Sequence, residues 1–419
     1  MALDKRQLSI QQATPVAPQA MAGQKGLALP HTALVWDDSL AEYRFTASHP
    51  LNPRRLELTL ELIRRLGLFD DTHRLVPARV ATDTEILAVH TPVFVAAVKG
   101  ASDGSLAAGE LRRFGLGTDD VPVVPGMHDA AAHIVGATLR AAELVMSGAV
   151  TRAFSIAGGL HHARRAEASG FCVYNDAAAA IRWMQQTHGA RVMYVDIDAH
   201  HGDGVQQIFY DDPGVLTLSF HESGAFLYPG TGFIEEMGAE DGYGYSVNVP
   251  LDPHTDDASF LDCVSTLVPR IAELFGPDVI VLQAGCDAHV LDPLTHLRCT
   301  TRLYRDATQV VCAAADAHCN GRVVATGGGG YAIHQVVPRA WTLVWATLSG
   351  LDPGDELPAD YVDMLARECA CDVPTALIDP PDAFARTRPS LEAEKANRHT
   401  VDAVRRRCYP LISGWGLGF

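Results

Sequence analysis

The stretch VMYVDIDAHHGDG (residues 192–204) combines an apolar run with three acids and two histidines. The run VMYV is typical of a buried strand, so the ionisable side chains lie at the carboxyl end of that strand. Alternate residues of an extended chain point the same way, and Asp198 and His200 can therefore face one cavity. In an open parallel sheet, ligands bind outside the carboxyl ends of the strands. The stretch predicts a parallel sheet with a functional site at its edge.

Apolar runs and amphipathic helical patterns alternate along the rest of the chain. This alternation predicts an α/β fold in which helices cover both faces of a central parallel sheet. The predicted strands lie in ALVW, AFSIAGG, VMYVDID, VLTLSF, VIVLQAG and RVVATGG, which begin at residues 33, 153, 192, 215, 279 and 322. We expect a flexible leader at 1–29, a main domain at 30–355, and a C-terminal extension at 356–419 that packs on the same domain and contains one helical stretch.

The composition excludes several classes of protein. With 47% hydrophobic and 20% charged residues, the 419-residue chain can bury a core of its own. Its formal charge of −17 disfavours nonspecific binding to nucleic acid or to an anionic membrane. We find no signal-peptide core and no run of about 18 apolar residues, so we expect a cytoplasmic protein with no membrane partner. The nine cysteines lack paired CxxC spacing, so neither a disulfide framework nor a zinc ribbon is expected.

Asp198 and His200 offer an oxygen and a nitrogen, which is half of a zinc site. Asp287 is the best-placed third ligand, because it follows the predicted strand in VIVLQAG. Three protein ligands leave one position of a tetrahedral ion for water or substrate, which indicates catalysis. Helix capping by the acids and a calcium site are the alternatives. His201 has the opposite parity and is left out of the metal set.

Two adjacent histidines, His161 and His162, follow the run AFSIAGG, whose glycine pair supplies a turn that lets both rings reach one ligand. Two imidazoles paired with acids can be tuned for different proton transfers, and Asp196 and Asp203 are the candidate acids. The run GGGGY brings Tyr331 to the end of another predicted strand. Its phenol can donate a hydrogen bond to a developing oxyanion beside a metal.

Together these motifs resemble the zinc-dependent histone deacetylase superfamily, and most closely its bacterial acetoin-utilisation, AcuC-type branch. The likeness covers roughly residues 33 to 350. It rests on HPLNPRR (49–55), GTDDVPVVPGMHD (117–129), GGLHHA (158–163), SGFCVYND (169–176), DIDAHHGDGV (196–205), PGTG (229–232), GCDAHVLDPL (285–294) and GGGGY (327–331), in the family's order.

The resemblance implies an arginase/deacetylase fold, with a sheet of about eight parallel strands and a narrow tunnel that ends at zinc. It implies that residues 30–355 form a metal-dependent deacetylase domain. The implied zinc ligands are Asp198, His200 and Asp287. The implied catalytic groups are His161, His162, Asp196, Asp203 and Tyr331. The implied substrate-binding residues are Asp120, Gly170, Phe171, Leu227, Tyr228 and Gly329.

The resemblance also implies further ions and an inner channel. One catalytic Zn²⁺ is expected, with Fe²⁺ as the alternative in the cell, and K⁺ is expected in a structural role. The implied inner potassium site comprises Asp196, Asp198, His200, Ser219 and Phe220. The implied second site comprises Phe209, Asp212, Val215 and Tyr245. Arg55 is expected to line an acetate channel. His289 stands where arginase-like enzymes with two manganese ions usually have an Asp, which favours one catalytic metal.

The implied activity is hydrolysis of N-ε-acetyl-lysine to lysine and acetate by a metal-dependent amidohydrolase. The implied partner is an acetylated protein, and acetylated acyl-CoA synthetase is the substrate class that the AcuC-type resemblance suggests. Deacetylation of an acetylpolyamine or another small acetylated metabolite is the alternative within enzymes. A catalytically silent module that binds acyl-lysine is the alternative outside them, and a homo-oligomer is compatible with either.

Overall fold

The computed structural model describes residues 31–380 and 383–414, so the predicted leader at 1–29 lies outside the described residues. Eight strands form one sheet in the order β2-β1-β3-β8-β7-β4-β5-β6. Every neighbouring pair is parallel, which confirms the predicted fold class. The strands are β1 (Thr32–Val35), β2 (His73–Val76), β3 (Arg152–Ser155), β4 (Val192–Asp196), β5 (Val215–Glu222), β6 (Ser246–Leu251), β7 (Val279–Gln283) and β8 (Val323–Thr326).

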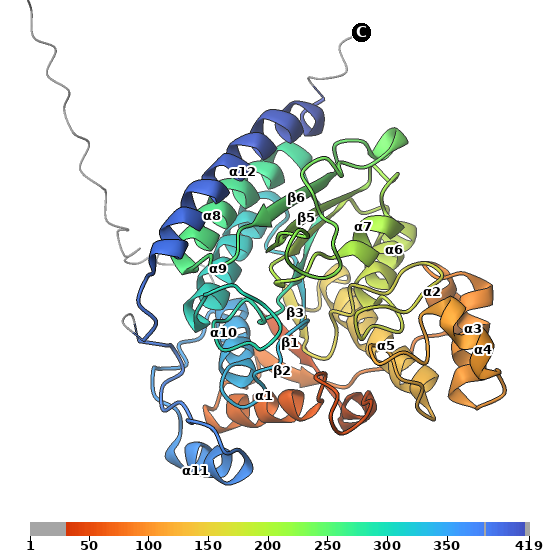
Figure 1. Cartoon of the computed structure of the whole chain (residues 1–419), viewed down its shortest axis with the longest axis horizontal. Coiled ribbons are helices and arrows are strands. Elements are labelled where there is room, and N and C mark those ends of the chain that lie inside the picture. The colour runs from red at the N-terminus through yellow and green to blue at the C-terminus, as the bar shows by residue number, and fades with distance from the viewer. Residues whose placement is uncertain (1–30, 381–382, 415–419) are drawn as a thin grey trace, which may run out of the picture.

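Helices cover both faces of this sheet, as Figure 1 shows. On one face, α5 packs along β1, β3 and β8, and α6 lies beside β4 and β7; on the other, α8, α9 and α10 cover the same central strands. The helices are α1 (Arg54–Arg65), α2 (Asp83–Leu87), α3 (Pro92–Ser102), α4 (Ala108–Leu111), α5 (Met127–Met146), α6 (Asp176–His188), α7 (Asp203–Ile208), α8 (Asp257–Phe275), α9 (Thr301–His318), α10 (Val337–Ser349), α11 (Ala359–Glu368) and α12 (Arg388–Ile412).

The central strands are buried on both faces, which explains why they appear in the sequence as continuous apolar runs. β4 and β7 are buried along their whole length. The indole rings of Trp341 and Trp345 on α10 belong to the same core, and both are 0% exposed. A rigid core of this kind fixes the strand ends, and with them the side chains that follow.

The C-terminal segment lies against this core. α12 packs on α8 and β6, and Asn397 on α12 donates its amide to the hydroxyl groups of Thr255 (2.8 Å) and Ser259 (2.9 Å). The segment contains two helices, α11 and α12, rather than the single helical stretch expected from the sequence. The division of the chain into domains stays a prediction.

Two further features bear on the composition. Cys369 and Cys371 form a disulfide, and the other seven cysteines are buried thiols. This single disulfide joins residues only two positions apart. It differs from a disulfide framework, in which several bridges join distant parts of a chain and which the sequence does not indicate. Within the described ranges, no helix has the length and apolarity that crossing a bilayer requires.

Candidate active site

The carboxyl ends of four neighbouring strands, β3, β8, β7 and β4, form the candidate active site. The histidine pair follows β3, and the run DIDAHH begins at the last residue of β4. Asp287 follows β7, and Tyr331 follows β8. Because the four strands are parallel, their loops emerge at the same edge of the sheet, as the sequence predicts.

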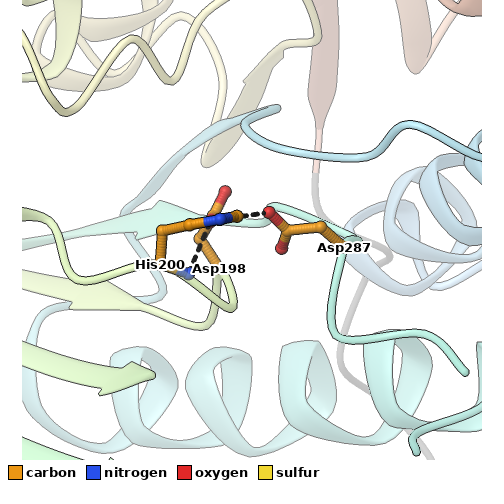
Figure 2. Close-up of side chains that lie close together, drawn as sticks. All are labelled: Asp198, His200 and Asp287. Atoms are coloured by element: carbon orange, nitrogen blue, oxygen red, sulfur yellow. Dashed lines mark hydrogen bonds and ion pairs between the residues drawn. The ribbon is translucent and has the colours of Figure 1, made fainter. Parts of the chain in front are cut away.

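The side chains of Asp198, His200 and Asp287 converge on one point (Figure 2). One ligand atom from each residue lies within 4.8 Å of the other two. His200 Nδ1 is 2.8 Å from Asp287 Oδ2 and 3.3 Å from Asp198 Oδ1, and all three side chains are buried. Two oxygens and one nitrogen at this spacing can hold one divalent ion.

The electrostatics of the cluster also fit a cation. Burial and the charge of Asp198 raise the pKa of Asp287 to about 6, because two carboxylates share a place that excludes water. A divalent ion held by both carboxylates and the imidazole would supply the missing positive charge. Carboxylate and imidazole ligands suit zinc, and they suit ferrous iron as well.

His289, two residues beyond Asp287, does not join this cluster. Its Nε2 lies 2.9 Å from Asp379 Oδ2, a side chain of the C-terminal segment. The position that would hold an acid for a second metal is therefore directed away from the site. Over the residues that the structure describes, the cluster of Asp198, His200 and Asp287 is the one group found with metal-ligand spacing.

The tandem histidines are each paired with one acid. His161 Nδ1 lies 2.8 Å from Asp196 Oδ2, and His162 Nδ1 lies 2.7 Å from Asp203 Oδ1. The two Nε2 atoms are 3.1 Å apart. Arg164 donates to Asp203 Oδ2 at 2.8 Å, which keeps that carboxylate charged. Both acids hold the Nδ1 side of the rings, which leaves Nε2 of each ring as the nitrogen that can exchange a proton with another group.

The two imidazoles have different electrostatic surroundings. Burial lowers the pKa of His161, but the charges of Asp196 and Asp198 outweigh burial and raise this pKa to about 9. Burial and the charge of His161 lower the pKa of His162 to about 4. At 3.1 Å, a proton on Nε2 of one ring can be donated to Nε2 of the other. Such a pair can both accept and return a proton.

The glycine loop, residues 327–330, brings the backbone close to the metal cluster. Gly329 N donates a hydrogen bond of 2.6 Å to Asp198 Oδ2. A Cβ atom at Gly329 would collide with Asp287 Oδ2, so this position has no room for a side chain. Gly329 therefore packs closely on two carboxylates of the metal-ligand cluster, and its role as a substrate contact stays a prediction.

Arg55 holds the glycine loop from the other side. Its Nη1 donates to the carbonyl oxygens of Gly328 (2.8 Å) and Gly330 (3.0 Å), and its guanidinium lies 5.0 Å from the centroid of Trp341. Arg55 also lines a small interior cavity of about 10 Å³. The structure thus shows Arg55 as a support of the loop, and its role in an acetate channel stays a prediction.

Aromatic side chains flank the catalytic groups. The ring of Phe171 meets that of Tyr331 edge to face, with centroids 5.7 Å apart, and the ring of Tyr228 meets His162 at 5.2 Å. Leu227 is half-buried and packs on the core beside Tyr228. These contacts place Phe171 against the tyrosine and Tyr228 against the histidine pair, and the role of all three as a tunnel wall stays a prediction.

Asp120 contacts the same wall. Its Oδ2 accepts the N–H of Gly170 at 2.7 Å. Phe171, the next residue, has a left-handed backbone with φ of 67°, which costs a residue with a side chain on the order of 1 kcal/mol. Tyr43 and His49, which the sequence analysis missed, stabilise this conformation: the Tyr43 hydroxyl donates to Phe171 O at 2.8 Å, and the His49 ring packs 4.6 Å from the Phe171 ring.

The residues assigned to potassium are placed near one another in two groups, and their role stays a prediction. In the inner group, Asp196 is paired in register with Ser219, and Phe220 follows on β5. In the second group, the N–H of Asp212 donates to Phe209 O, and the N–H of Val215 donates to Asp212 O. Tyr245 O accepts the N–H of Thr217, which lies two residues beyond Val215 on β5.

Buried polar residues behind the histidine pair also escaped the sequence analysis. Asn175 donates its amide to the backbone carbonyls of His161 (3.2 Å) and Ala163 (2.9 Å). The Tyr194 hydroxyl donates to Asp196 Oδ2 at 2.7 Å. Asn175 belongs to the motif SGFCVYND, which the sequence analysis identified. The sequence alone could not show that its side chain bonds the carbonyls of His161 and Ala163.

Comparisons with known proteins agree with this geometry. The model of the histone deacetylase domain matches residues 49–348, a range that contains the four strand ends of the candidate site. The acetoin utilization protein AcuC of Bacillus subtilis (strain 168) is 45% identical over 370 residues, covering 88% of this chain and 95% of that protein. AcuC of Staphylococcus xylosus is 40% identical over 374 residues, covering 89% and 97%.

Two solved structures share the fold. An HDAC homolog complexed with SAHA superposes with a TM-score of 0.80 at 30% identity, covering 89% of this chain and 99% of that one. An HDAC homolog from Aquifex aeolicus gives a TM-score of 0.77 at 30% identity, covering 88% and 99%. Since the matched domain contains the four strand ends and the relatives extend over most of the chain, this protein belongs to the histone deacetylase family and is an AcuC-like deacetylase.

Proposed function

We propose that this deacetylase hydrolyses the amide of N-ε-acetyl-lysine in an acetylated protein, releasing lysine and acetate, with zinc as the catalytic ion. The observation that carries the proposal is the meeting of a metal-ligand cluster, an acid-paired histidine tandem and a tyrosine at one sheet edge. Amide hydrolysis requires these three elements: an electrophilic ion, a proton shuttle and an oxyanion donor.

Zinc held by Asp198, His200 and Asp287 would supply a Lewis acid that polarises a carbonyl and lowers the pKa of a water molecule. Nε2 of the histidine pair accepts the proton that the attacking water loses. The Tyr331 hydroxyl donates a hydrogen bond to the oxyanion of the tetrahedral intermediate. His162 then returns a proton to the leaving nitrogen, so that lysine departs as an amine.

The surroundings of the site support a lysine side chain within a peptide. The rings of Phe171 and Tyr228 offer apolar surface to the methylene groups of lysine. Asp120 is half-buried at the same wall, where its carboxylate can accept a backbone N–H of the substrate. Acetylated acyl-CoA synthetase is the target class that we would test first, and potassium at the two predicted groups is part of the same proposal.

The test is turnover of an acetyl-lysine peptide by protein that has been stripped with a chelator and reloaded with zinc or Fe²⁺. We expect zinc to restore activity in the parent and not in Asp287→Ala. Tyr331→Phe should lower kcat about 100-fold while a peptide still binds, because one oxyanion donor is lost. Tyr304→Phe is the matched control: Tyr304 is buried, and its hydroxyl has no hydrogen-bond partner among the described residues.

Other outcomes identify the alternatives. An acetylpolyamine turned over in preference to the peptide would replace the protein substrate with a small metabolite. Peptide binding with no turnover of either substrate by the zinc-loaded parent would indicate a binding module. Asp120→Ala should raise KM for the peptide, and unchanged peptide turnover would contradict the role assigned to Asp120.

A further inference from the structure

Asp292 is a buried carboxylate that lies between the metal-ligand loop and Tyr331. It is 6% exposed and belongs to the loop after β7, five residues beyond Asp287. Its Oδ1 accepts the N–H of Leu294 at 3.0 Å, and its Oδ2 accepts the N–H of Tyr331 at 2.8 Å. The Asp292 side chain therefore links its own loop to Tyr331, the residue that follows the glycine loop.

The second of these bonds acts directly after the run of four glycines at 327–330. Gly328 and Gly330 have φ of 144° and 145°, and glycine backbones lack the steric limits that would otherwise fix the direction of the next residue. The Tyr331 N–H is the first backbone donor beyond the glycines. Its hydrogen bond to Asp292 Oδ2, 2.8 Å long, holds the nitrogen next to the Cα atom from which the Tyr331 side chain projects.

The bond also couples two loops that must stay in register. Asp292 follows Asp287, whose carboxylate belongs to the metal cluster, while Tyr331 provides the proposed oxyanion donor. The carboxylate of Asp292 reaches Tyr331 through the backbone and makes its other bond within its own loop. Its contacts thus set the position of the donor relative to the metal-ligand loop.

We propose that Asp292 is a positioning residue for the reaction, which fixes the backbone of Tyr331 so that the phenol hydroxyl lies where the oxyanion develops. This inference rests on the proposed function of Tyr331 as that donor. Asp292 acts on the rate through Tyr331 alone, and substrate binding does not depend on it.

The test is a double-mutant cycle with Asp292→Asn and Tyr331→Phe, measured as kcat and KM for an acetyl-lysine peptide with zinc-loaded enzyme. The amide of Asn presents a donor where one of the two backbone N–H groups needs an acceptor. We expect kcat to fall about 10- to 100-fold with KM within about twofold, since a displaced catalytic group costs this much. In the Tyr331→Phe background, the same substitution should change kcat less than about twofold.

Two further variants complete the design. Asp257→Asn is the matched control, because Asp257 also accepts a backbone N–H, that of Thr300 at 2.7 Å, but supports the start of α9; its kcat should equal that of the parent. Asp292→Glu retains the carboxyl group and moves it by one methylene group, so it should show the same loss in kcat with the fold intact. Hydrogen exchange of the peptide that contains Tyr331 should be faster in both Asp292 variants.

Several results would overturn the inference. Full activity in Asp292→Asn would overturn it. Asp292→Asn would also overturn it if it lowered kcat by the same factor in the parent and in the Tyr331→Phe background. Failure of both Asp292 variants to fold would show that the carboxylate serves the fold as a whole, which also contradicts a role confined to Tyr331. If the zinc-loaded parent does not turn over the peptide, the proposed function fails instead, and unchanged hydrogen exchange at Tyr331 in the variants would then reject the inference separately.

Discussion

His90 is a buried imidazole whose neutral form the fold requires, and acid should therefore destabilise the protein through it. The ring is 3% exposed. Its Nε2 accepts the N–H of Asn175 at 3.0 Å, so Nδ1 carries the proton and donates to Arg164 O at 2.9 Å. Protonation of Nε2 would place its N–H against the N–H of Asn175, so two donors would face each other without an acceptor. Burial lowers the pKa of His90 to about 4.

The magnitude follows from the difference between the two states. In the unfolded chain, a histidine has a pKa of about 6.5, so between pH 6.5 and about 4 the unfolded state binds a proton that the folded state excludes. The free energy of unfolding therefore falls as the pH falls below 6.5. At about 1.4 kcal/mol per pH unit for one proton, the loss from this residue between pH 7 and pH 5 is about 2 kcal/mol.

Urea unfolding at pH 7 and pH 5, followed by tryptophan fluorescence, measures this loss in the parent and in His90→Gln. The variant should be less stable at pH 7 by about 1–2 kcal/mol, because one buried hydrogen bond is lost. Its stability should then fall by about 2 kcal/mol less than that of the parent on acidification. His399→Gln is the control, since His399 is exposed on α12 and should leave the difference unchanged. Parallel pH profiles for the parent and His90→Gln would refute the reasoning.

Three other substitutions test neighbouring parts of the site. Asp379→Ala should lower the free energy of unfolding by about 3–5 kcal/mol in urea titrations, because Arg339, 2% exposed, loses its partner at 2.8 Å; an unchanged midpoint would contradict this. Gly329→Ala should weaken zinc binding at least about 10-fold, since the added methyl group displaces the Asp287 carboxylate. Competition with a chromophoric chelator measures the affinity, and an unchanged affinity would show that the glycine loop can move aside. Asp203→Asn should lower kcat at least about 10-fold and alter its pH profile, because the second histidine of the pair loses its acid; an unaltered profile would exclude this coupling.

The central strands could be predicted from the sequence, and the edge strands could not. β1, β3, β4, β5, β7 and β8 each overlap one of the predicted apolar runs. β2 and β6 are the two edges of the sheet, and their sequences HRLV and SVNVPL contain polar residues or proline. Strands with one neighbour tolerate such residues, so they lack the continuous apolar pattern on which the prediction depended.

The residues at the strand ends could likewise be predicted, because a parallel sheet places all such ends at one edge. Asp198, His200 and Asp287 meet for this reason. The supports behind them could not be predicted, since Asp292 reaches Tyr331 across 39 positions and Tyr43 reaches Phe171 across 128. Local patterns contain no information about such pairs, which the packing of distant loops creates.

The loop that contains Leu227 and Tyr228 leaves the sheet from β5, outside the four strands whose ends hold the metal ligands, the histidine pair and the tyrosine. Substitutions in this loop therefore leave unchanged the four strand ends from which those groups project. Selection for a new acyl group can act on this loop while the reaction itself is preserved. The order of the strands thus sets this one part of the proposed substrate wall apart from the strand ends that hold the metal ligands and the histidine pair.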